Sequence, residues 1–319
     1  MTALASLVVP TRNRQNELRA LLLSAAEQTA PLEIIVMDDG STDGTPEMVR
    51  QEFPHARLHQ ITTGRGPAFQ RNRGITLATT NVIFPLDDDA KFISSRTVEQ
   101  TLAEFDHPRV AAIAIPYINA RYDDRVWQRA PVSDDHWITY AFIGAAHAIR
   151  RDIFLEVGGY REHFIYMGEE SDLCLRLLEK GYVTCLGHAD PIHHLESPRR
   201  DNALADRCGR RNDVLFAWQN VPWNALPLHL AATTVNGILT GIRSRHFLRM
   251  LQGTLSGYAG FISGRYERKP VRKEIYHLHR RLKKCGAQKL REVEHQLSPV
   301  QIAQGPTRRE DSAKIARCR

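Results

Sequence analysis

Hydrophobic and polar residues along the first 120 positions follow two alternating periods. Apolar, β-branched runs that end at turns predict strands, whereas apolar residues three or four positions apart predict helices. We expect strands at 5–10, 32–41, 56–61, 81–89 and 110–118, and helices at 13–28, 45–53 and 67–78. Because neighbouring parallel strands need a crossover, and a helix is the usual one, this order predicts an α/β fold with a mostly parallel central sheet.

Polar residues gather where these predicted strands end. Pro10, Thr11 and Arg12 close the first strand, residues 38–41 follow the second, and residues 87–89 are three consecutive aspartates after the fourth. In open sheets of this kind, ligands bind beyond the carboxyl ends of the strands. Three adjacent negative charges repel one another unless a cation or hydrogen-bond donors meet them. The pattern therefore predicts a binding crevice, with an acidic surface turn as the alternative reading of the aspartates.

A second acidic group stands at the start of a predicted helix. Residues 119–137 read as a polar loop, and SDLCLRLLEKGY at 171–182 has helical spacing and a glycine near its end. Glu169, Glu170 and Asp172 lie at the beginning of this helix. Negative charge at a helix N-terminus contributes roughly 0.3–1 kcal/mol. These residues thus have a structural explanation as well as a catalytic one.

Charge is distributed unevenly between the two parts of the chain. Residues 1–198 carry 19 Lys and Arg against 27 Asp and Glu, whereas residues 199–319 carry 24 against 9, so the net charges are −8 and +15. We expect a catalytic domain at 1–200, a helical basic region at 201–303 and a disordered tail at 304–319. The basic region suits an anionic partner, either a phospholipid surface, a phosphorylated lipid or a nucleic acid. A merely solvated pair of helices fits the charge as well.

Cysteine usage and hydropathy bear on the compartment. The five cysteines are scattered without a CxxC pair, which argues against a disulfide framework or a thiolate metal site. The longest uncharged run, at 226–242, contains a proline, a histidine, an asparagine and two glycines, so it falls short of a membrane span. We expect a cytoplasmic protein that is peripheral on the inner face of the cell membrane if its basic region binds lipid.

Seven motifs in order carry a family resemblance. VVPTRNR, VMDDGSTDGT, QRNRG, LDDDA, VGGY, GEESDLCLRL and IHHLESPRR, over about residues 4–200, resemble glycosyltransferase family 2. The resemblance implies the GT-A nucleotide-binding fold and inverting, metal-dependent transfer of a hexosyl or deoxyhexosyl group. It further implies a nucleotide-sugar donor, with UDP or dTDP sugars favoured, and a saccharide or lipid-linked acceptor.

The resemblance assigns the acidic strand end to the metal and the donor. Asp89 would bind Mn²⁺ or Mg²⁺, Asp87 would face the ribose or sugar, and Asp88 would assist or face solvent. Hard divalent cations prefer oxygen ligands and neutralise a departing diphosphate. Adjacent strand residues face opposite ways, so at most one of the two histidines in IHHLESPRR should meet the metal. His193 is favoured over His194 because it falls where the first family histidine does, with a structural histidine as the alternative.

The other family positions concern the nucleotide and the acceptor. Asp39 would accept a hydrogen bond from the base, or else cap its own turn. Pro10, Thr11 and Arg12 would line the base, and Arg71 would lie near the base or diphosphate unless it is an uninvolved surface arginine. The family usually shows Glu-Asp where this chain has Glu169-Glu170. Glu170 is expected to be the general base, and Glu169 is the second candidate for this role. Weaker candidates for a diphosphate-binding lid are Ser197, Arg199 and Arg200.

Two other functions remain as alternatives. A sugar-phosphate nucleotidyltransferase would need a glycine-rich loop after the first strand, which VVPTRNR lacks, and no GxGxxG follows that strand as in dinucleotide-dependent oxidoreductases. A nucleic-acid-binding protein driven by the basic region is the non-enzymatic alternative, and nucleic acid is the less favoured partner.

Trp218 and Trp223 beside arginines suit a bilayer interface, whereas packing on the catalytic domain or forming a homodimer explains them equally well.

Overall fold

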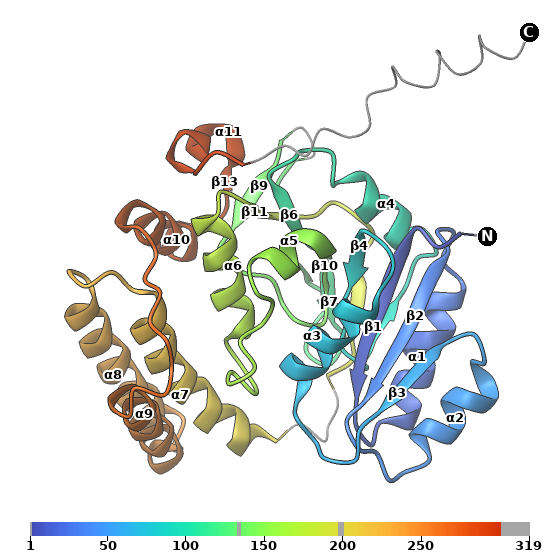
Figure 1. Cartoon of the computed structure of the whole chain (residues 1–319), viewed down its shortest axis with the longest axis horizontal. Coiled ribbons are helices and arrows are strands. Elements are labelled where there is room, and N and C mark those ends of the chain that lie inside the picture. Colours follow the sequence, from blue (N-terminus) through green and yellow to red (C-terminus); the bar gives the residue numbers. More distant parts are fainter. Residues whose placement is uncertain (1, 133–134, 197–200, 301–319) are drawn as a thin grey trace, which may run out of the picture.

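Two sheets surrounded by helices form the protein in a computed structural model that describes residues 2–132, 135–196 and 201–300 (Figure 1). Among these residues the larger sheet has nine strands. Its order is β13 (Gln288–Lys289), β9 (Trp137–Thr139), β11 (Val183–Leu186), β6 (Val110–Ala114), β10 (His147–Arg150), β4 (Val82–Phe84), β1 (Ala5–Thr11), β2 (Leu32–Asp38), β3 (Arg57–Gln60). The smaller sheet has the order β5 (Ala90–Phe92), β12 (Ile192–His194), β7 (Tyr117–Asn119), β8 (Val126–Trp127).

Strand directions confirm the α/β class and refine it. The order β3-β2-β1-β4 is parallel throughout, as the alternation of strands and helices predicts. Beyond β4 the sheet is mixed, because β10 runs antiparallel to both of its neighbours, β4 and β6. The mostly parallel arrangement therefore holds for the half of the sheet that carries the first three polar strand ends.

Two predicted strands are shorter in the structure because prolines interrupt them. The run at 110–118 divides into β6 and β7, which belong to different sheets, and Pro116 lies between them. The run at 81–89 yields only β4, which Pro85 follows. Proline has no N–H to donate to a sheet ladder. The three aspartates consequently lie in the loop between β4 and β5, where successive side chains need not point to opposite faces as they do in a strand.

Helices cover both faces of the parallel half. Alternate residues of β1 point to opposite faces: Leu7 and Val9 pack in one apolar cluster with α1 and α2, and Val8 packs in the other with α3, α5 and α6. The helices of this part are α1 (Gln15–Ala26), α2 (Thr45–Glu52), α3 (Pro67–Leu77), α4 (Thr97–Ala103), α5 (Arg151–Glu156) and α6 (Glu169–Glu179). The sheet is thus buried on both sides, which leaves its carboxyl edge as the open place for a site.

The C-terminal region is helical and is joined to the larger sheet. It comprises α7 (Asn202–Asn220), α8 (Leu226–Arg243), α9 (Phe247–Ile262), α10 (Lys273–Cys285), α11 (Leu290–Val293) and a 3₁₀ turn at Glu294–Gln296. Helices α7, α8 and α9 pack on one another at one side of the molecule (Figure 1). Helix α10 packs on α6, and β13 pairs with β9. Within the described parts of the chain, no helix has the length and apolarity that crossing a membrane requires.

Candidate active site

A cleft of about 1010 Å³ lies at the carboxyl ends of β1, β2 and β4. Because those strands are parallel and adjacent, the loops that follow them meet at one edge of the sheet. The sequence candidates found in the lining are Pro10, Thr11, Arg12, Asp39, Arg71, Asp87, Asp88, Asp89, Glu169 and Glu170. The structure therefore brings together candidate residues that are far apart in the sequence. His193, which is also among the described residues, lies outside this lining.

Asp88 points inward, which corrects the alternative that it faces solvent. Its side chain is buried, and its carboxylate accepts hydrogen bonds from Thr11 Oγ1 and Arg14 Nη1, each at 2.8 Å. Burial raises the pKa of Asp88 to about 7, although the charge of Arg14 opposes this shift. Asp88 thus anchors the acidic loop to β1 and to the residues after it.

Asp87, Asp89 and His194 form a group that could hold a metal ion. One ligand atom from each lies within 4.8 Å of the others, and His194 Nε2 is 3.4 Å from Asp89 Oδ1. Two carboxylates and an imidazole form a donor set suited to Mn²⁺ and acceptable to Mg²⁺. The residues present therefore fit the cation that the DDD sequence suggests. Burial lowers the pKa of His194, but the hydrogen bond and charge of Asp89 outweigh this effect and raise it.

The preference for His193 is corrected by this geometry. Both histidines lie on β12, which pairs with β5 and β7, so their side chains face opposite ways. His194 lies opposite Ala90, directly after the aspartates, and it lines the cleft. The expectation that one histidine of the pair reaches the aspartates was sound, but the residue that does so is His194.

Arg71 connects Asp87 to the acidic start of α6. It projects from α3, is only 3% exposed, and pairs with Asp87 through Nη2. Its Nη1 lies 3.5 Å from Glu169 Oε1. Burial and repulsion by Glu170 raise the pKa of Glu169 despite this arginine. A buried guanidinium between two acidic groups is inconsistent with an uninvolved surface arginine.

Glu170 lies beside Glu169 and faces the cleft, where a backbone position without a side chain makes room for it. A Cβ on Gly144 would lie 3.0 Å from Glu170 Oε1 and 2.9 Å from Arg71 Nη2. Burial raises the pKa of Glu170, while the charge of Arg71 lowers it. A raised pKa makes a carboxylate a stronger base, which suits it to accept a proton from a hydroxyl.

Asp39 organises the loop on the opposite wall of the cleft. Its carboxylate accepts the backbone N–H of Arg65 at 2.9 Å and of Gly66 at 3.0 Å, and Gln70 Nε2 at 2.6 Å. The turn that follows β2 is instead held by Asp38, which accepts the N–H of Ser41. Turn capping at this place therefore belongs to Asp38, and Asp39 is directed at the cleft lining.

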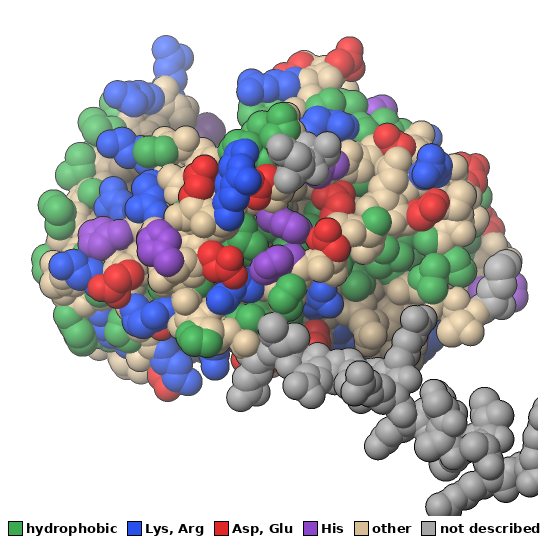
Figure 2. Space-filling model, turned by 90° about the horizontal axis from the view of Figure 1, so that it is seen from above, with side chains coloured by type: hydrophobic (Ala, Val, Ile, Leu, Met, Phe, Trp, Pro, Cys, Tyr) green, Lys and Arg blue, Asp and Glu red, His purple; other side chains and the backbone are tan. Residues whose placement is uncertain are grey.

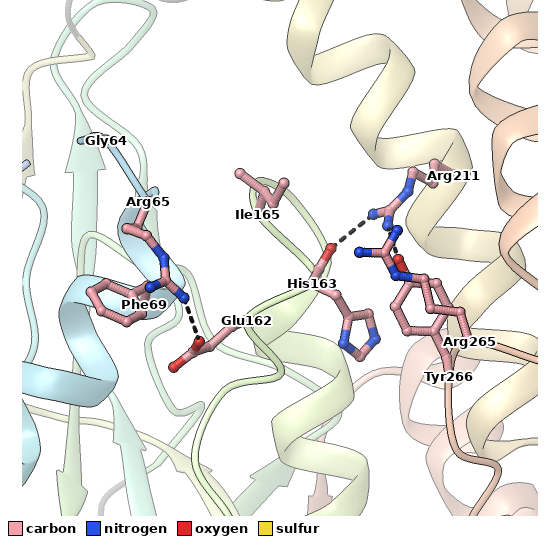
Figure 3. Close-up of a pocket in the computed structure, with 9 residues that line it drawn as sticks. All are labelled: Gly64, Arg65, Phe69, Glu162, His163, Ile165, Arg211, Arg265 and Tyr266. Atoms are coloured by element: carbon pink, nitrogen blue, oxygen red, sulfur yellow. Dashed lines mark hydrogen bonds and ion pairs between the residues drawn. The ribbon is translucent and has the colours of Figure 1, made fainter.

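A smaller hollow of about 380 Å³ adjoins the cleft and shares three lining residues with it, Gly64, Arg65 and Ile165. Figure 3 shows Arg65, Phe69 and Glu162 on one side and Arg211 with Arg265 and Tyr266 on the other. Arg65 pairs with Glu162, and Arg211 is held by the carbonyl of His163 and the hydroxyl of Tyr266. Three arginines against one glutamate make this hollow electropositive.

Comparison with known proteins gives the family. Residues 6–161 match the family model described as glycosyl transferase family 2. The chain belongs to this family. A related curated protein, the pre-mycofactocin glycosyltransferase of Mycobacterium tuberculosis strain H37Rv, is 31% identical over 194 residues, which are 55% of this chain and 39% of that protein. The uncharacterised glycosyltransferase YibD of Escherichia coli K12 is 33% identical over 132 residues, 40% of this chain and 38% of its own length. The matched segment thus spans about two fifths of each relative.

Solved structures of other proteins share the fold. The mannosyltransferase PcManGT from Pyrobaculum calidifontis, solved with GDP-Man and Mn²⁺, aligns with a TM-score of 0.56 at 18% identity over 83% of this chain and 89% of that chain. Residues 1–349 of S. aureus TarS, solved with UDP-GlcNAc, align with a TM-score of 0.57 at 17% identity over 86% and 83%. At such identities the comparison establishes the GT-A fold.

Some site residues of this family member are not evident from its sequence. Arg14 is one of two arginines in VVPTRNR, and it pairs with Asp88 and Asp89 across more than 70 positions of the chain. Gln70 reaches Asp39 from the first turn of α3. The motif indicates that these residues matter, but only the fold shows which acidic group each one meets. Ser197, Arg199 and Arg200, proposed as a lid, lie outside the described residues, as does the tail after 303.

Proposed function

We propose that this protein transfers a sugar from a nucleotide-diphosphate donor to an acceptor hydroxyl with inversion at the anomeric carbon. One observation carries the proposal: the metal-fitting group Asp87, Asp89 and His194 and the acidic pair at the start of α6 line the same cleft and are connected through Arg71. Family membership supports it. GDP-Man with Mn²⁺ in PcManGT and UDP-GlcNAc in TarS support a nucleotide-sugar donor.

The acidic loop would hold the cation. Asp87, Asp89 and His194 would bind Mn²⁺ or Mg²⁺, which when bound supplies positive charge against the departing diphosphate. Arg71 keeps the carboxylate of Asp87 oriented, and Thr11 and Arg14 fix Asp88 beneath it. Preorganised charge of this kind needs little rearrangement when negative charge develops on the leaving group.

The acidic pair would perform the proton transfer. Glu170 faces the cleft and takes the proton from the acceptor hydroxyl, while the acceptor oxygen forms a bond to the anomeric carbon. The bond between that carbon and the diphosphate oxygen breaks on the opposite side, and the diphosphate leaves with the electron pair. Displacement from the opposite side in a single step inverts the configuration. Glu169 is more deeply buried and is paired with Arg71, so it positions the arginine and Glu170.

The other wall of the cleft would bind the nucleotide. Pro10, Thr11 and Arg12 border it at the end of β1, and Asp39 holds the loop that contains Arg65. Oδ2 of Asp39 accepts the N–H of Gly66 and has a second lone pair, which suits the N3–H of uracil or thymine. This supports a UDP or dTDP sugar as donor.

We place the acceptor in the electropositive hollow beside the cleft, because the two spaces share lining residues. Three arginines favour an acceptor that carries negative charge, such as the phosphate of a lipid-linked saccharide. Arg265→Glu should therefore slow transfer to such an acceptor while leaving nucleotide binding unchanged. Equal transfer by this variant and the wild type would exclude the hollow as the acceptor site.

The activity is tested by incubating the protein with a panel of UDP, dTDP and GDP sugars in the presence of Mn²⁺ and measuring release of the nucleoside diphosphate. We expect one donor to be turned over, and we expect chelation of the metal to stop the reaction. Asp89→Asn should be inactive with its fold intact, whereas Asp124→Asn, a change at an exposed loop aspartate, should keep full activity. Turnover that persists equally in Asp89→Asn would contradict the role of the acidic loop.

A further inference from the structure

Helices α8 and α9 form a hairpin whose outer surface is unusual for a water-facing helix pair. They are joined by residues 244–246 and pack on each other and on α7. Large apolar side chains on this hairpin are exposed to 37–78%, and they are Leu228, Val235, Ile238, Leu239, Ile242, Phe247, Leu248, Leu255 and Ile262. We call these nine residues the apolar face.

The apolar face arises because small residues of the hairpin are buried while its large apolar residues are exposed. On α8, positions 228, 235, 239 and 242 recur at helical spacing on the outer side, while Gly237 and Gly241 are buried. On α9 the buried positions include Gly253 and Gly257. A Cβ at Gly253 would lie 2.4 Å from the carbonyl oxygen of Arg207, and one at Gly257 would lie 2.7 Å from Val214 Cβ. Small residues thus bring the hairpin close to α7, and the large apolar residues are left outside.

The charge on the hairpin has one sign. Residues 226–264 contain no aspartate or glutamate, and their three charged side chains are those of Arg243, Arg245 and Arg249, all exposed. Trp223, which is 64% exposed, lies three positions before the first residue of α8. Figure 2 shows the left side of the molecule, where Figure 1 places the C-terminal helices, with hydrophobic side chains among basic, acidic and histidine side chains of these helices.

Taken together, these features match the chemistry of a lipid interface. Apolar side chains enter the boundary between headgroups and acyl chains, arginines meet anionic headgroups, and tryptophan favours the interfacial depth. A second copy of the same hairpin is a poorer occupant, because it would offer no acidic residue to the three arginines. We propose that the α8–α9 hairpin docks the protein on an anionic phospholipid surface, with the apolar face lying in the interface.

This proposal is narrower than the sequence expectation of a basic C-terminal region. It assigns docking to the hairpin and gives no part to the lysines and arginines of α10, whose apolar residues Ile275, Leu278 and Leu282 are buried in the core. It also holds independently of the sugar-transfer activity, since no residue of the cleft takes part.

Co-sedimentation with vesicles tests the proposal. Wild-type protein should bind vesicles of phosphatidylglycerol and phosphatidylcholine, and bind at least about tenfold less to phosphatidylcholine alone. The double variant Leu228→Glu, Leu255→Glu should lose at least about tenfold in binding to the anionic vesicles. Its matched control is Leu23→Glu, which changes a leucine 54% exposed on α1 and should bind like the wild type.

A second pair of variants distinguishes docking by the hairpin from attraction by the basic charge of the whole C-terminal region. Arg249→Glu should weaken vesicle binding several-fold, whereas Lys284→Glu on α10 should not. Thermal unfolding of every variant should match the wild type, because each changed side chain is exposed. The proposal is overturned if the wild type does not bind anionic vesicles. It is also overturned if Arg249→Glu and Lys284→Glu lose equal amounts of binding while the double leucine variant loses none. A wild-type dimer that the double leucine variant converts to monomers would likewise overturn it.

Discussion

The guanidinium of Arg71 pairs with the carboxylate of Asp87, and its other terminal nitrogen lies 3.5 Å from Glu169. One buried side chain of α3 therefore contacts both the loop after β4 and the first turn of α6. The loop carries Asp87 and Asp89, two of the three residues of the metal-fitting group, and α6 carries the proposed base. Their relative position, on which a displacement reaction depends, is held by this arginine.

Replacing Arg71 should weaken both the fold and the site. Arg71→Met removes the positive charge between two acidic groups, one of them buried, which costs about 3 kcal/mol in the free energy of unfolding. The matched control is Arg73→Met, two positions along the same helix but exposed, which should change stability little. Urea denaturation followed by circular dichroism measures both. Equal stability of the two variants would show that the Arg71 contacts have no structural weight.

The two adjacent histidines provide a direct test of the metal-fitting group. His194→Ala removes an imidazole that lies 3.4 Å from Asp89 and should weaken Mn²⁺ binding by at least about tenfold. His193→Ala, on the opposite side of the same strand, should leave Mn²⁺ affinity unchanged. Titration calorimetry with Mn²⁺ distinguishes them. A loss confined to His193→Ala would restore the first sequence expectation and contradict the geometry described above.

Glu170→Gln should separate chemistry from binding. The amide keeps the size of the side chain but cannot accept the proton, so turnover should fall by about 10²- to 10⁴-fold. Nucleotide binding should persist, because Asp39 and the end of β1 are untouched. Glu169→Gln should lower turnover less. The measurement is kcat and KM for donor turnover, and a rise in KM with unchanged kcat would assign Glu170 to binding.

Stability should decline with rising pH through ionisation of the buried acidic pair. Burial and repulsion by Glu170 raise the pKa of Glu169, so the folded state binds this proton more tightly than the unfolded state. The free energy of unfolding therefore falls as pH rises from about 4.3, the ordinary glutamate pKa, through the raised value. Glu169→Gln should flatten this decline, whereas Glu47→Gln at an exposed position of α2 should not. A variant with the wild-type pH profile would contradict the assignment.

The sequence was sufficient to predict where most of the candidate site residues come together. Periodicity located β1, β2 and β4, and the polar residues after them had to meet once those strands were parallel. The choice between His193 and His194 was not accessible in this way, because it depends on the register of β12 against β5. The pairing of Arg14 with Asp88 likewise depends on contacts between segments 74 residues apart.

The C-terminal helices show the same limit. The uncharged run at 226–242 falls in the region that was predicted to be helical, but the sequence did not indicate which side of the helix is buried. Apolar burial usually places leucine and isoleucine inside. In the structure, glycines are inside because α7 and α9 approach closely, and the larger residues are exposed. Such an inversion is set by packing between helices and cannot be read from one helix alone.

Thermal shift with nucleoside diphosphates, with and without Mn²⁺, measures whether the cleft binds a nucleotide through a metal ion. We expect UDP or dTDP to raise the unfolding temperature of the wild type only when Mn²⁺ is present. Asp89→Asn should lose this gain while unfolding like the wild type without ligand. If no nucleoside diphosphate stabilises the wild type in the presence of Mn²⁺, or if Asp89→Asn retains the full gain, the cleft is not the metal-dependent nucleotide site proposed here.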